Sequence, residues 1–316
     1  MIDFHYLKTG IDGLANAHKA GTLAGHLGAA VVAGYFFGED QSDLPDGVFR
    51  GIEGEMKRII AGEEAIWWNA KQAGVTPADL FQKLPQEEPK PDTIQTIAVA
   101  LQKNVSELRE SGHNIIFASI AIRALKDHSD FATPQVIGGV RKLIEGFNTA
   151  HPGKGYYGKE KGWVYGNKIE LAADDKFRPY GSLQEMVEVT IEELIATAPI
   201  KKQGFGGLWH IINHAAAIVE MDRFGFKELA KLALPAHHQH IRLWRSLPDV
   251  EGELGAVRKA EHDPHDPSYW KGMLKRDEAR LTHRIKTLYG FYTLKRYIEK
   301  DAQRKKAEDA FLYLMA

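Results

Sequence analysis

The spacing of apolar and small residues predicts helices along almost the whole chain. The most apolar stretch runs from His18 to Phe37. Small side chains recur in it every four residues, at Ala17, Gly21, Gly25, Ala29 and Ala33. Residues four apart share one face of an α-helix, so we expect a single helix that another helix can approach closely. His18 and His26, eight positions apart, are expected to share a face of that helix.

Helical hairpins that begin with a Gly-His pair recur in the sequence. Gly25-His26 begins one apolar helix whose partner ends near Gly62, and Gly112-His113 begins another whose partner ends near Gly146. A third, weaker copy begins at His283. Recurring hairpins are typical of helical-repeat proteins. The predicted fold class is therefore all-α, with stacked helical hairpins that close into an α/α toroid or stay open like an α-solenoid.

Residues with capping chemistry mark the expected starts of several helices. Thr-Pro pairs at 76–77 and 133–134 place a capping hydroxyl before a proline in the first turn. Ser182 with Glu185 forms a capping box, and Asp266 is a further candidate N-cap. Apolar residues at helical spacing predict one more helix over residues 48–73.

One long segment, about 150–181, has no helical period. It is rich in glycine, lysine and aromatic residues, among them Tyr157 and Trp163. Irregular segments of this length are uncommon inside a compact domain and often cover a ligand. We interpret it either as a flap over a planar or anionic ligand or as a surface insertion with a small hairpin. The chain is otherwise expected to form a single domain over residues 1–316, with a possible soft boundary at the proline-rich linker 85–92.

Composition narrows the function classes. The 316 residues are 44% hydrophobic and 26% charged with a net charge of −1, which argues against a nucleic-acid-binding face. No cysteine is present, so disulfides and thiolate chemistry are excluded. Residues 20–37 carry no formal charge, but four glycines, a threonine and a histidine argue against a membrane span. With no signal-peptide pattern at Met1, we expect a cytoplasmic protein without membrane partners.

Histidines are the strongest candidates for chemistry. His210 and His214 are four apart, the spacing of metal ligands on one helix face, and His237 and His240 form a second pair. Imidazole transfers protons near neutral pH and binds Zn or Fe through its neutral nitrogen. If the hairpins close into a ring, the histidines that begin helices, His26, His113 and His283, converge on one cavity. A single histidine on an apolar helix, however, is more often a hydrogen-bonded core or interface residue than a functional one.

Several common motifs are missing. The sequence has no phosphate-binding loop, no nucleophile elbow and no His-Glu-x-x-His motif. It also has no Gly-x-Gly-x-x-Gly between a strand and a helix, so a nicotinamide would not be held in a Rossmann site. Glu110 and His113 match the Glu-x-x-His of di-iron bundles, but no second copy is present.

The segment 205–218, FGGLWHIINHAAAI, resembles a motif of the questin-oxidase-like family, in which an aromatic–His pair opens a buried helix. Trp209-His210 stands where that pair would be. The early helix led by His18 or His26 and the late hairpin from His283 are also similar to elements of that family. The chain departs from the family pattern where Asn-His is expected before the first helix.

The resemblance implies an oxidoreductase of the monooxygenase type that inserts oxygen into a ring of an aromatic polyketide quinone and opens it, with NADPH as reductant. His210 would then be an acid–base residue or a ligand. We also expect Tyr157, Trp163 and Trp209 to contact the substrate, although the tract 156–163 has no counterpart in that family. His26, His113, His214 and His283 would line the cavity.

Two other functions stay open. The first is a metal-dependent enzyme in which His210 and His214, with a neighbouring His or Glu, hold Zn or Fe. The second is a helical-repeat protein that binds a ligand without chemistry. In every case the expected partner is a small molecule.

Overall fold

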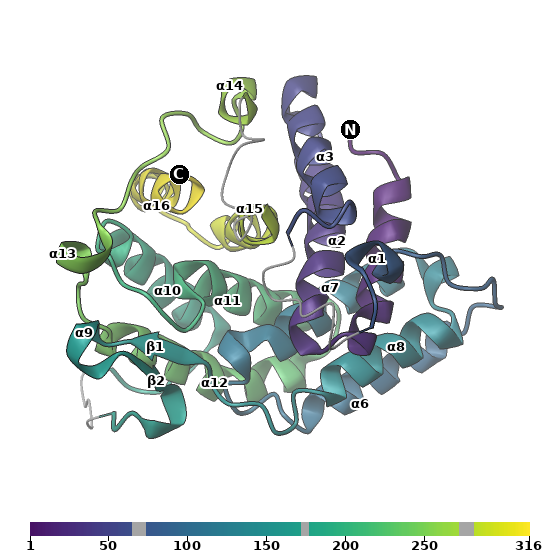
Figure 1. The fold of residues 1–316 in the computed structure, drawn as a ribbon, viewed down its shortest axis with the longest axis horizontal. Coiled ribbons are helices and arrows are strands. Elements are labelled where there is room, and N and C mark those ends of the chain that lie inside the picture. The colour runs from purple at the N-terminus through teal and green to yellow at the C-terminus, as the bar shows by residue number, and fades with distance from the viewer. Residues whose placement is uncertain (65–73, 172–176, 272–280) are drawn as a thin grey trace. The chain divides into compact units, whose positions relative to one another are not determined.

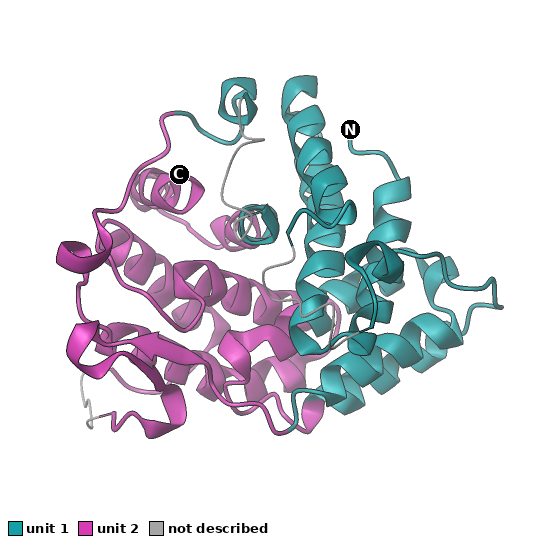
Figure 2. Cartoon of the chain, in the orientation of Figure 1, with its two compact units in different colours: residues 1–101, 117–148, 262–289 teal, residues 102–116, 149–261, 290–316 magenta. Residues whose placement is uncertain are grey.

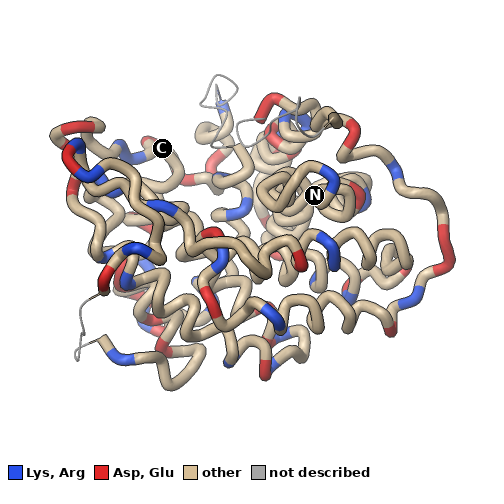
Figure 3. The backbone as a smooth tube through the Cα atoms, turned by 60° about the horizontal axis from the view of Figure 1, so that its bottom comes forward, with Lys and Arg blue, Asp and Glu red and all other residues tan. Residues whose placement is uncertain are grey.

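A computed structural model describes residues 1–64, 74–171, 177–271 and 281–316, and these residues are mostly helical (Figure 1). The strands in this part of the chain form one two-stranded sheet. The predicted all-α class is thereby confirmed. Across the same residues, no helix combines the length and the apolar character needed to cross a membrane. Lys and Arg are interspersed with Asp and Glu along the backbone (Figure 3).

The chain divides into two compact units, each built from three segments (Figure 2). Unit 1 comprises residues 1–101, 117–148 and 262–289, and unit 2 comprises residues 102–116, 149–261 and 290–316. The divisions pass through α7 (His113–Asp127) and α15 (Leu281–Lys295), which therefore contribute residues to both units, and they separate the last residue of α6 (Gln95–Gln102) from the rest of that helix. The linker 85–92 lies inside unit 1.

Unit 1 is built around a tightly packed helix pair, α1 and α2 (Figure 1). Its α-helices, besides parts of α7 and α15, are α1 (His5–Asn16), α2 (Gly25–Asp40), α3 (Asp46–Ile60), α5 (Pro77–Leu80), α6 (Gln95–Gln102), α8 (Pro134–Glu145) and α14 (Pro267–Trp270). Short 3-10 helices are η1 (Ala17–Lys19), η2 (Thr22–Ala24), η3 (Pro91–Ile94) and η5 (Ser129–Phe131).

The single helix predicted over His18–Phe37 is wrong. α1 ends at Asn16, two 3-10 turns follow, and α2 begins only at Gly25. Gly21 interrupts the helix because its φ of +103° lies in a region that glycine alone adopts readily. His18 and His26 therefore do not share a helix face. The expected close approach does occur, but at Gly28, where an added Cβ would overlap the backbone of Leu14 on α1.

Capping residues predicted the starts of helices more accurately than apolar spacing predicted where helices end. The side chains of Thr76, Thr133, Ser182 and Asp266 all accept hydrogen bonds from backbone N–H groups at the starts of helices, as predicted. Of the capping box predicted at Ser182, only this half is found, because the Glu185 carboxylate accepts from Gly181 N at 2.6 Å. The helix expected over 48–73 ends instead at Ile60, before a turn in which Gly62 has a φ of +80°. Residues 65–73 of that prediction lie outside the described residues.

Unit 2 contains the helices α10, α11 and α12, which pack against one another (Figure 1). Besides parts of α7 and α15, its elements are η4 (Glu110–Gly112), β1 (Lys154–Tyr156), α9 (Gly158–Lys161), β2 (Trp163–Tyr165), η6 (Gly166–Lys168), α10 (Leu183–Thr197), α11 (Gly207–Arg223), α12 (Lys227–Ser246), α13 (Glu251–Leu254) and α16 (Asp301–Met315). α12 continues through Pro235.

The irregular segment predicted near 150–181 contains a small hairpin. β1 and β2 pair antiparallel, with Lys154 opposite Tyr165. On its other side β1 meets the segment before α11: Phe205 N donates to Lys154 O at 2.7 Å, and Tyr156 N donates to Gln203 O at 2.8 Å. β1 is therefore held from two sides. Residues 172–176 of the segment lie outside the described residues.

Candidate functional site

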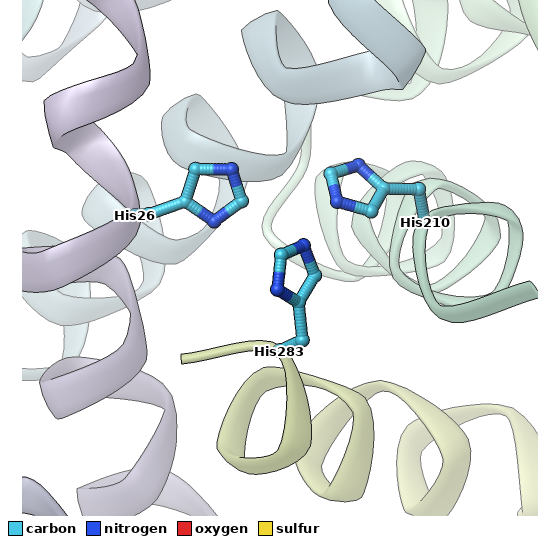
Figure 4. A group of neighbouring side chains, drawn as sticks. All are labelled: His26, His210 and His283. Atoms are coloured by element: carbon cyan, nitrogen blue, oxygen red, sulfur yellow. The ribbon is translucent and has the colours of Figure 1, made fainter. Parts of the chain in front are cut away.

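Unit 1 brings together two of the predicted histidines. His26 is the second residue of α2 and His283 the third of α15, and their ring centroids lie 4.9 Å apart (Figure 4). His26 is buried and His283 half-buried. The edge of the His26 ring also meets Phe117, at 5.5 Å between centroids. Both histidines stand at helix starts, where the hairpin pattern placed them, although Thr282 and not a glycine precedes His283.

Lys286 completes this cluster from one turn further along α15. Its Nζ contacts His26 Nδ1 and lies 5.8 Å from the centre of the Phe117 ring, and its side chain is 2% exposed. Burial disfavours the ammonium form and lowers the pKa of Lys286 to about 7, against the opposing charge of Glu64. In a large fraction of molecules the Lys286 amine is therefore neutral at physiological pH, and its lone pair can accept a proton or attack an electrophile.

Glu64 follows α3 in the sequence, and its buried carboxyl group contacts the first turn of α15. It accepts hydrogen bonds from Thr282 N at 2.6 Å and Thr282 Oγ1 at 3.2 Å. Burial raises the pKa of Glu64 to about 8, while the Thr282 bonds and the charge of Lys286 act in the opposite direction. The low-dielectric surroundings thus push both Glu64 and Lys286 toward their neutral forms. We call His26, Glu64, His283 and Lys286 the unit 1 centre.

A buried ion pair fixes the helix that carries this centre. Arg284 donates to both carboxylate oxygens of Glu55 on α3, at 3.0 and 2.8 Å, and both side chains are almost fully buried. The same carboxylate raises the pKa of Arg284. Bidentate pairs hold orientation as well as charge, so the register of α15 against α3 is tightly set.

Unit 2 contains a second set of buried histidines. His113, at the start of α7, and His210, on α11, meet edge to face with ring centroids 4.4 Å apart. His210 Nδ1 lies 3.4 Å from the carbonyl oxygen of Ser111. His210, labelled in Figure 4, extends from the first turns of α11. The structure thus pairs His113 with His210 in unit 2 and His26 with His283 in unit 1. Convergence of all four on one cavity stays a prediction.

His214, His237 and His240 form the core of the α11–α12 packing. His214 Nδ1 lies 3.2 Å from His240 Nδ1, and the rings of His214 and His237 are 5.1 Å apart. Burial lowers the pKa of each imidazole, of His237 to about 3 and of His240 to about 4. These three side chains are therefore neutral at pH 7. The predicted pairs at 210/214 and 237/240 lie on adjoining helices, and metal binding by His210 and His214 stays a hypothesis.

Strained backbone surrounds these histidines. Among the described residues, the non-glycine residues with positive φ are Glu110, Ser111 and Phe205. Their carbonyls are used: Ser111 O faces His210, and Phe205 O accepts from His240 Nε2 at 2.8 Å. Strain of this kind persists only where the surroundings impose it, and it clusters at functional sites.

The aromatic residues predicted to contact substrate all lie in unit 2. Trp209 Nε1 donates to Leu314 O on α16 at 2.9 Å, and Tyr157 OH lies 2.7 Å from Ser246 Oγ on α12. Trp163 is 53% exposed and packs against Tyr156. Trp209 and Tyr157 thus make defined structural contacts. Their role in binding a substrate stays a prediction.

Sequence reasoning missed Lys286 and Glu64. Lysine on a helix usually extends into water, and Glu64 follows a glycine turn, so neither stood out. A usable signal was the run TLYGFYTL directly after Lys286, which has no charge and predicts a buried helix. A charged residue at the edge of such a run, three positions after a histidine, is predicted to be buried on the same helix face as that histidine.

The fold and these centres define an all-α protein with two groups of buried imidazoles, one of them next to a buried amine. A comparison of the chain with protein-family models, with curated proteins and with solved structures found no match. The two groups of imidazoles are therefore the basis of the proposed function.

Proposed function

We propose that this protein is an oxidoreductase that acts on a small aromatic substrate, and that the unit 1 centre supplies its acid–base groups. The contact between the Lys286 amine and His26 carries the proposal. Burying an amine costs free energy, and a fold that needed only packing would place an apolar residue there. Perturbed titratable groups at one place are typical of functional sites.

The chemistry of such a substrate matches the centre. A phenol has an unperturbed pKa near 10, and loss of its proton makes the ring electron-rich and easier to oxidise. Lys286, with a pKa of about 7, accepts a proton at neutral pH, and His26 in contact with it can pass the proton on. Phe117 offers an apolar ring face next to the amine. The centre thus suits removal of a phenolic proton next to an aromatic ring.

The family resemblance also implies NADPH. A dinucleotide is usually held by a strand–turn–helix unit, and the described residues contain no such unit, since their single sheet is the β1–β2 hairpin. The described residues therefore do not fit the usual NADPH site, and we derive no step through that cofactor.

A metal-dependent oxidoreductase is the second candidate. His26 and His283 place two imidazoles side by side, and neutral ring nitrogens are good ligands for Zn or Fe. They would hold the ion together with further ligands, and a redox-active ion would supply the electron transfer to oxygen. Elemental analysis of purified wild-type protein and of His26→Phe and His283→Phe tests this candidate. Loss of a bound transition metal in both variants supports it, and a metal-free wild type with no affinity for added Fe or Zn contradicts it.

Lys286→Met tests the acid–base role directly. With a monohydroxyanthraquinone as substrate, and with molecular oxygen and NADPH supplied as oxidant and reductant, we expect wild type to bleach the quinone absorbance. We expect Lys286→Met to slow this by at least about a hundredfold, the usual contribution of a general base. His26→Phe should have a comparable effect.

Two exposed residues provide matched controls. Lys231→Met removes a lysine from the surface of α12, and His262→Phe replaces an exposed histidine. Both should retain the wild-type rate. An unchanged rate in a folded Lys286→Met protein would contradict the role of the amine. Tight quinone binding without turnover in wild type would favour the non-catalytic binding protein.

Three further hypotheses belong to this proposal. The hairpins are proposed to repeat as a toroid or solenoid, supported by the Gly-His starts of α2 and α7. The partner is proposed to be a small molecule, and the location cytoplasmic.

A further inference from the structure

The register of the β1–β2 hairpin places four side chains on one of its faces. Lys154 lies opposite Tyr165, and Tyr156 lies opposite Trp163. Side chains alternate between the two faces of a strand, so these four share one face, which we call the outer face. Gly155 points to the other face, where an added Cβ would overlap side chains packed against the hairpin. The inner face is therefore closed, whereas Lys154 and Trp163 on the outer face are exposed.

Aromatic rings make up most of the outer face. Trp163 is 53% exposed, and its ring lies 5.6 Å from that of Tyr156 at an angle of 49°. The Tyr156 hydroxyl donates to Glu253 at 2.8 Å, and the Tyr165 ring lies 4.3 Å below the ammonium group of Lys154. Both tyrosines are thus held by neighbours, while the indole of Trp163 keeps a large surface on which a planar group can stack.

The hairpin is basic although the whole chain is not. Residues 154–168 contain four lysines and one glutamate, whereas the net charge of all 316 residues is −1. Lys159 and Lys161 lie on α9 at the tip of the hairpin, and Lys154 and Lys168 lie at its base. All four are exposed, and among the described residues none of their ammonium groups takes part in an ion pair. Positive charge therefore lies on both sides of the exposed ring.

We propose that the outer face of the hairpin binds a single-stranded nucleic acid, with a base stacked on Trp163 and the adjacent phosphates against the lysines on either side. A stacked ring with a negative charge before and after it is the repeating pattern of a nucleotide strand. The strand must be single, because the bases of a duplex are already stacked on one another. The backbone hydrogen bonds on both sides of β1 keep this face rigid. The proposal does not depend on the oxidoreductase function.

The tip of the hairpin argues against a lipid surface as the partner. A segment that binds at a membrane interface inserts apolar side chains among the lipids. The tip here is α9, and its side chains Lys159, Glu160 and Lys161 are all charged and exposed. Insertion of this tip would remove three charges from water, which costs free energy. Phosphates of a nucleic acid, in contrast, meet the lysines without burying them.

Fluorescently labelled oligothymidylate and oligouridylate of about eight nucleotides are the probes for binding. By fluorescence anisotropy at low salt, we expect wild type to bind both, and to bind a duplex of the same length more weakly. A preference for one of the two strands supports the proposal and distinguishes DNA from RNA as the ligand. No binding of either strand, or equal binding of the duplex, overturns it.

Variants of Trp163 test the stacking. Trp163→Ala should weaken binding of both oligonucleotides at least about fivefold, the effect of losing one stacked base. Trp163→Tyr keeps a ring at this position and should stay within about threefold of wild type. Phe4→Ala removes an exposed ring from unit 1 and is the control, with no expected change. Unchanged affinity in Trp163→Ala overturns the proposal.

The salt dependence of binding tests the lysines. For single strands, the logarithm of the binding constant falls with the logarithm of salt concentration by about 0.7 per phosphate contact. The double variant Lys159→Gln, Lys161→Gln should therefore lose about 1.4 from this slope, whereas Lys231→Gln on α12 should keep the wild-type slope. Equal slopes in wild type and the double variant contradict the proposal. Binding to phosphatidylserine vesicles that Trp163→Ala abolishes, without binding of oligonucleotides, would assign the outer face to a membrane instead.

Discussion

Lys286 shows how one buried side chain sets the chemistry of its surroundings. In water its amine would be charged at every physiological pH, but in unit 1 it lies against His26 and Phe117 with Glu64 as the nearby acid. The fold gives up stability to enclose it. This is the pattern expected where a site is selected for reactivity rather than for packing.

The pH dependence of stability provides a direct test of this burial. Unfolded lysine has a pKa near 10.5, whereas the pKa of folded Lys286 is about 7, so between these values the unfolded state binds the extra proton. The free energy of unfolding should therefore rise with pH in this window, by up to about 1.4 kcal/mol per pH unit from this residue. Lys286→Met should lack that contribution. Urea unfolding at pH 8.5 and 10 measures the difference, and Lys231→Met, an exposed control, should keep the wild-type slope. Parallel pH profiles for wild type and Lys286→Met would contradict the burial argument.

Single residues were the hardest scale to predict from sequence. The histidines were recognised because imidazole transfers protons near neutral pH and binds metals, and His26 and His283 do meet. Lys286 was not recognised, because its burial depends on α2 and Phe117, which are distant in sequence. Neither the approach of His240 to His214 nor the strain at Phe205 leaves a local trace, since both arise from packing across unit 2.

At the scale of elements, neighbouring glycines on α8 play opposite roles. A Cβ on Gly139 would overlap the carbonyl of Ala15 on α1, whereas nothing lies within 4 Å of a Cβ on Gly138. Gly139 therefore permits the close packing of α8 on α1, and Gly138 only weakens the helix.

This contrast predicts opposite effects of the same substitution. Gly138→Ala should raise the free energy of unfolding by about 0.5–1 kcal/mol, because alanine favours the helix and costs no contact. Gly139→Ala should lower it by about 1–3 kcal/mol through overpacking against α1. Thermal unfolding of the two variants beside wild type gives the comparison. A stabilised Gly139→Ala would contradict the close contact between α8 and α1 at this position.

Helix starts were predictable because capping is local. Thr76, Thr133, Ser182 and Asp266 act within three residues of themselves, and all four cap as expected. The break at Gly21 was not predictable from the pattern, because apolar spacing continues through it and only the backbone angle changes. The sequence predicted a small hairpin but not the residues of β1 and β2, because backbone hydrogen bonds from residues 203–205, about 50 positions later, help to hold β1 in place.

For the whole molecule, the two units should respond differently to acid. In unit 2, burial lowers the pKa values of His214, His237 and His240 below the unfolded value near 6.5. The unfolded state then binds more protons, so stability is full above pH 6.5 and is lost as the pH falls toward about 4. In unit 1, the raised pKa of Glu64 has the opposite effect between about pH 8 and 4.5.

Hydrogen exchange can resolve this difference within one molecule. Between pH 7 and pH 5, protection factors of amides in α11 and α12 should fall by on the order of tenfold or more, and those in α2 and α3 should fall less. Exchange is compared as protection factors, so that the pH dependence of the chemical rate cancels. Equal losses in the two units would contradict the assignment of acid sensitivity to the unit 2 histidines.

Division of unit 1 among three separate segments constrains how the protein is made. The residues that enclose Lys286 and Phe117 include α2, yet α15 follows His26 by about 250 residues. At usual rates of translation, α2 waits roughly 12–50 s on the ribosome for its partner. Throughout that time the side of α2 that later meets α15 lacks its partner, although α1 and α3 already cover other parts of the helix. Nascent chains of this protein should therefore depend on chaperones that shield an early helix, and a pause in translation before α15 should lower the yield of folded protein more than one after it.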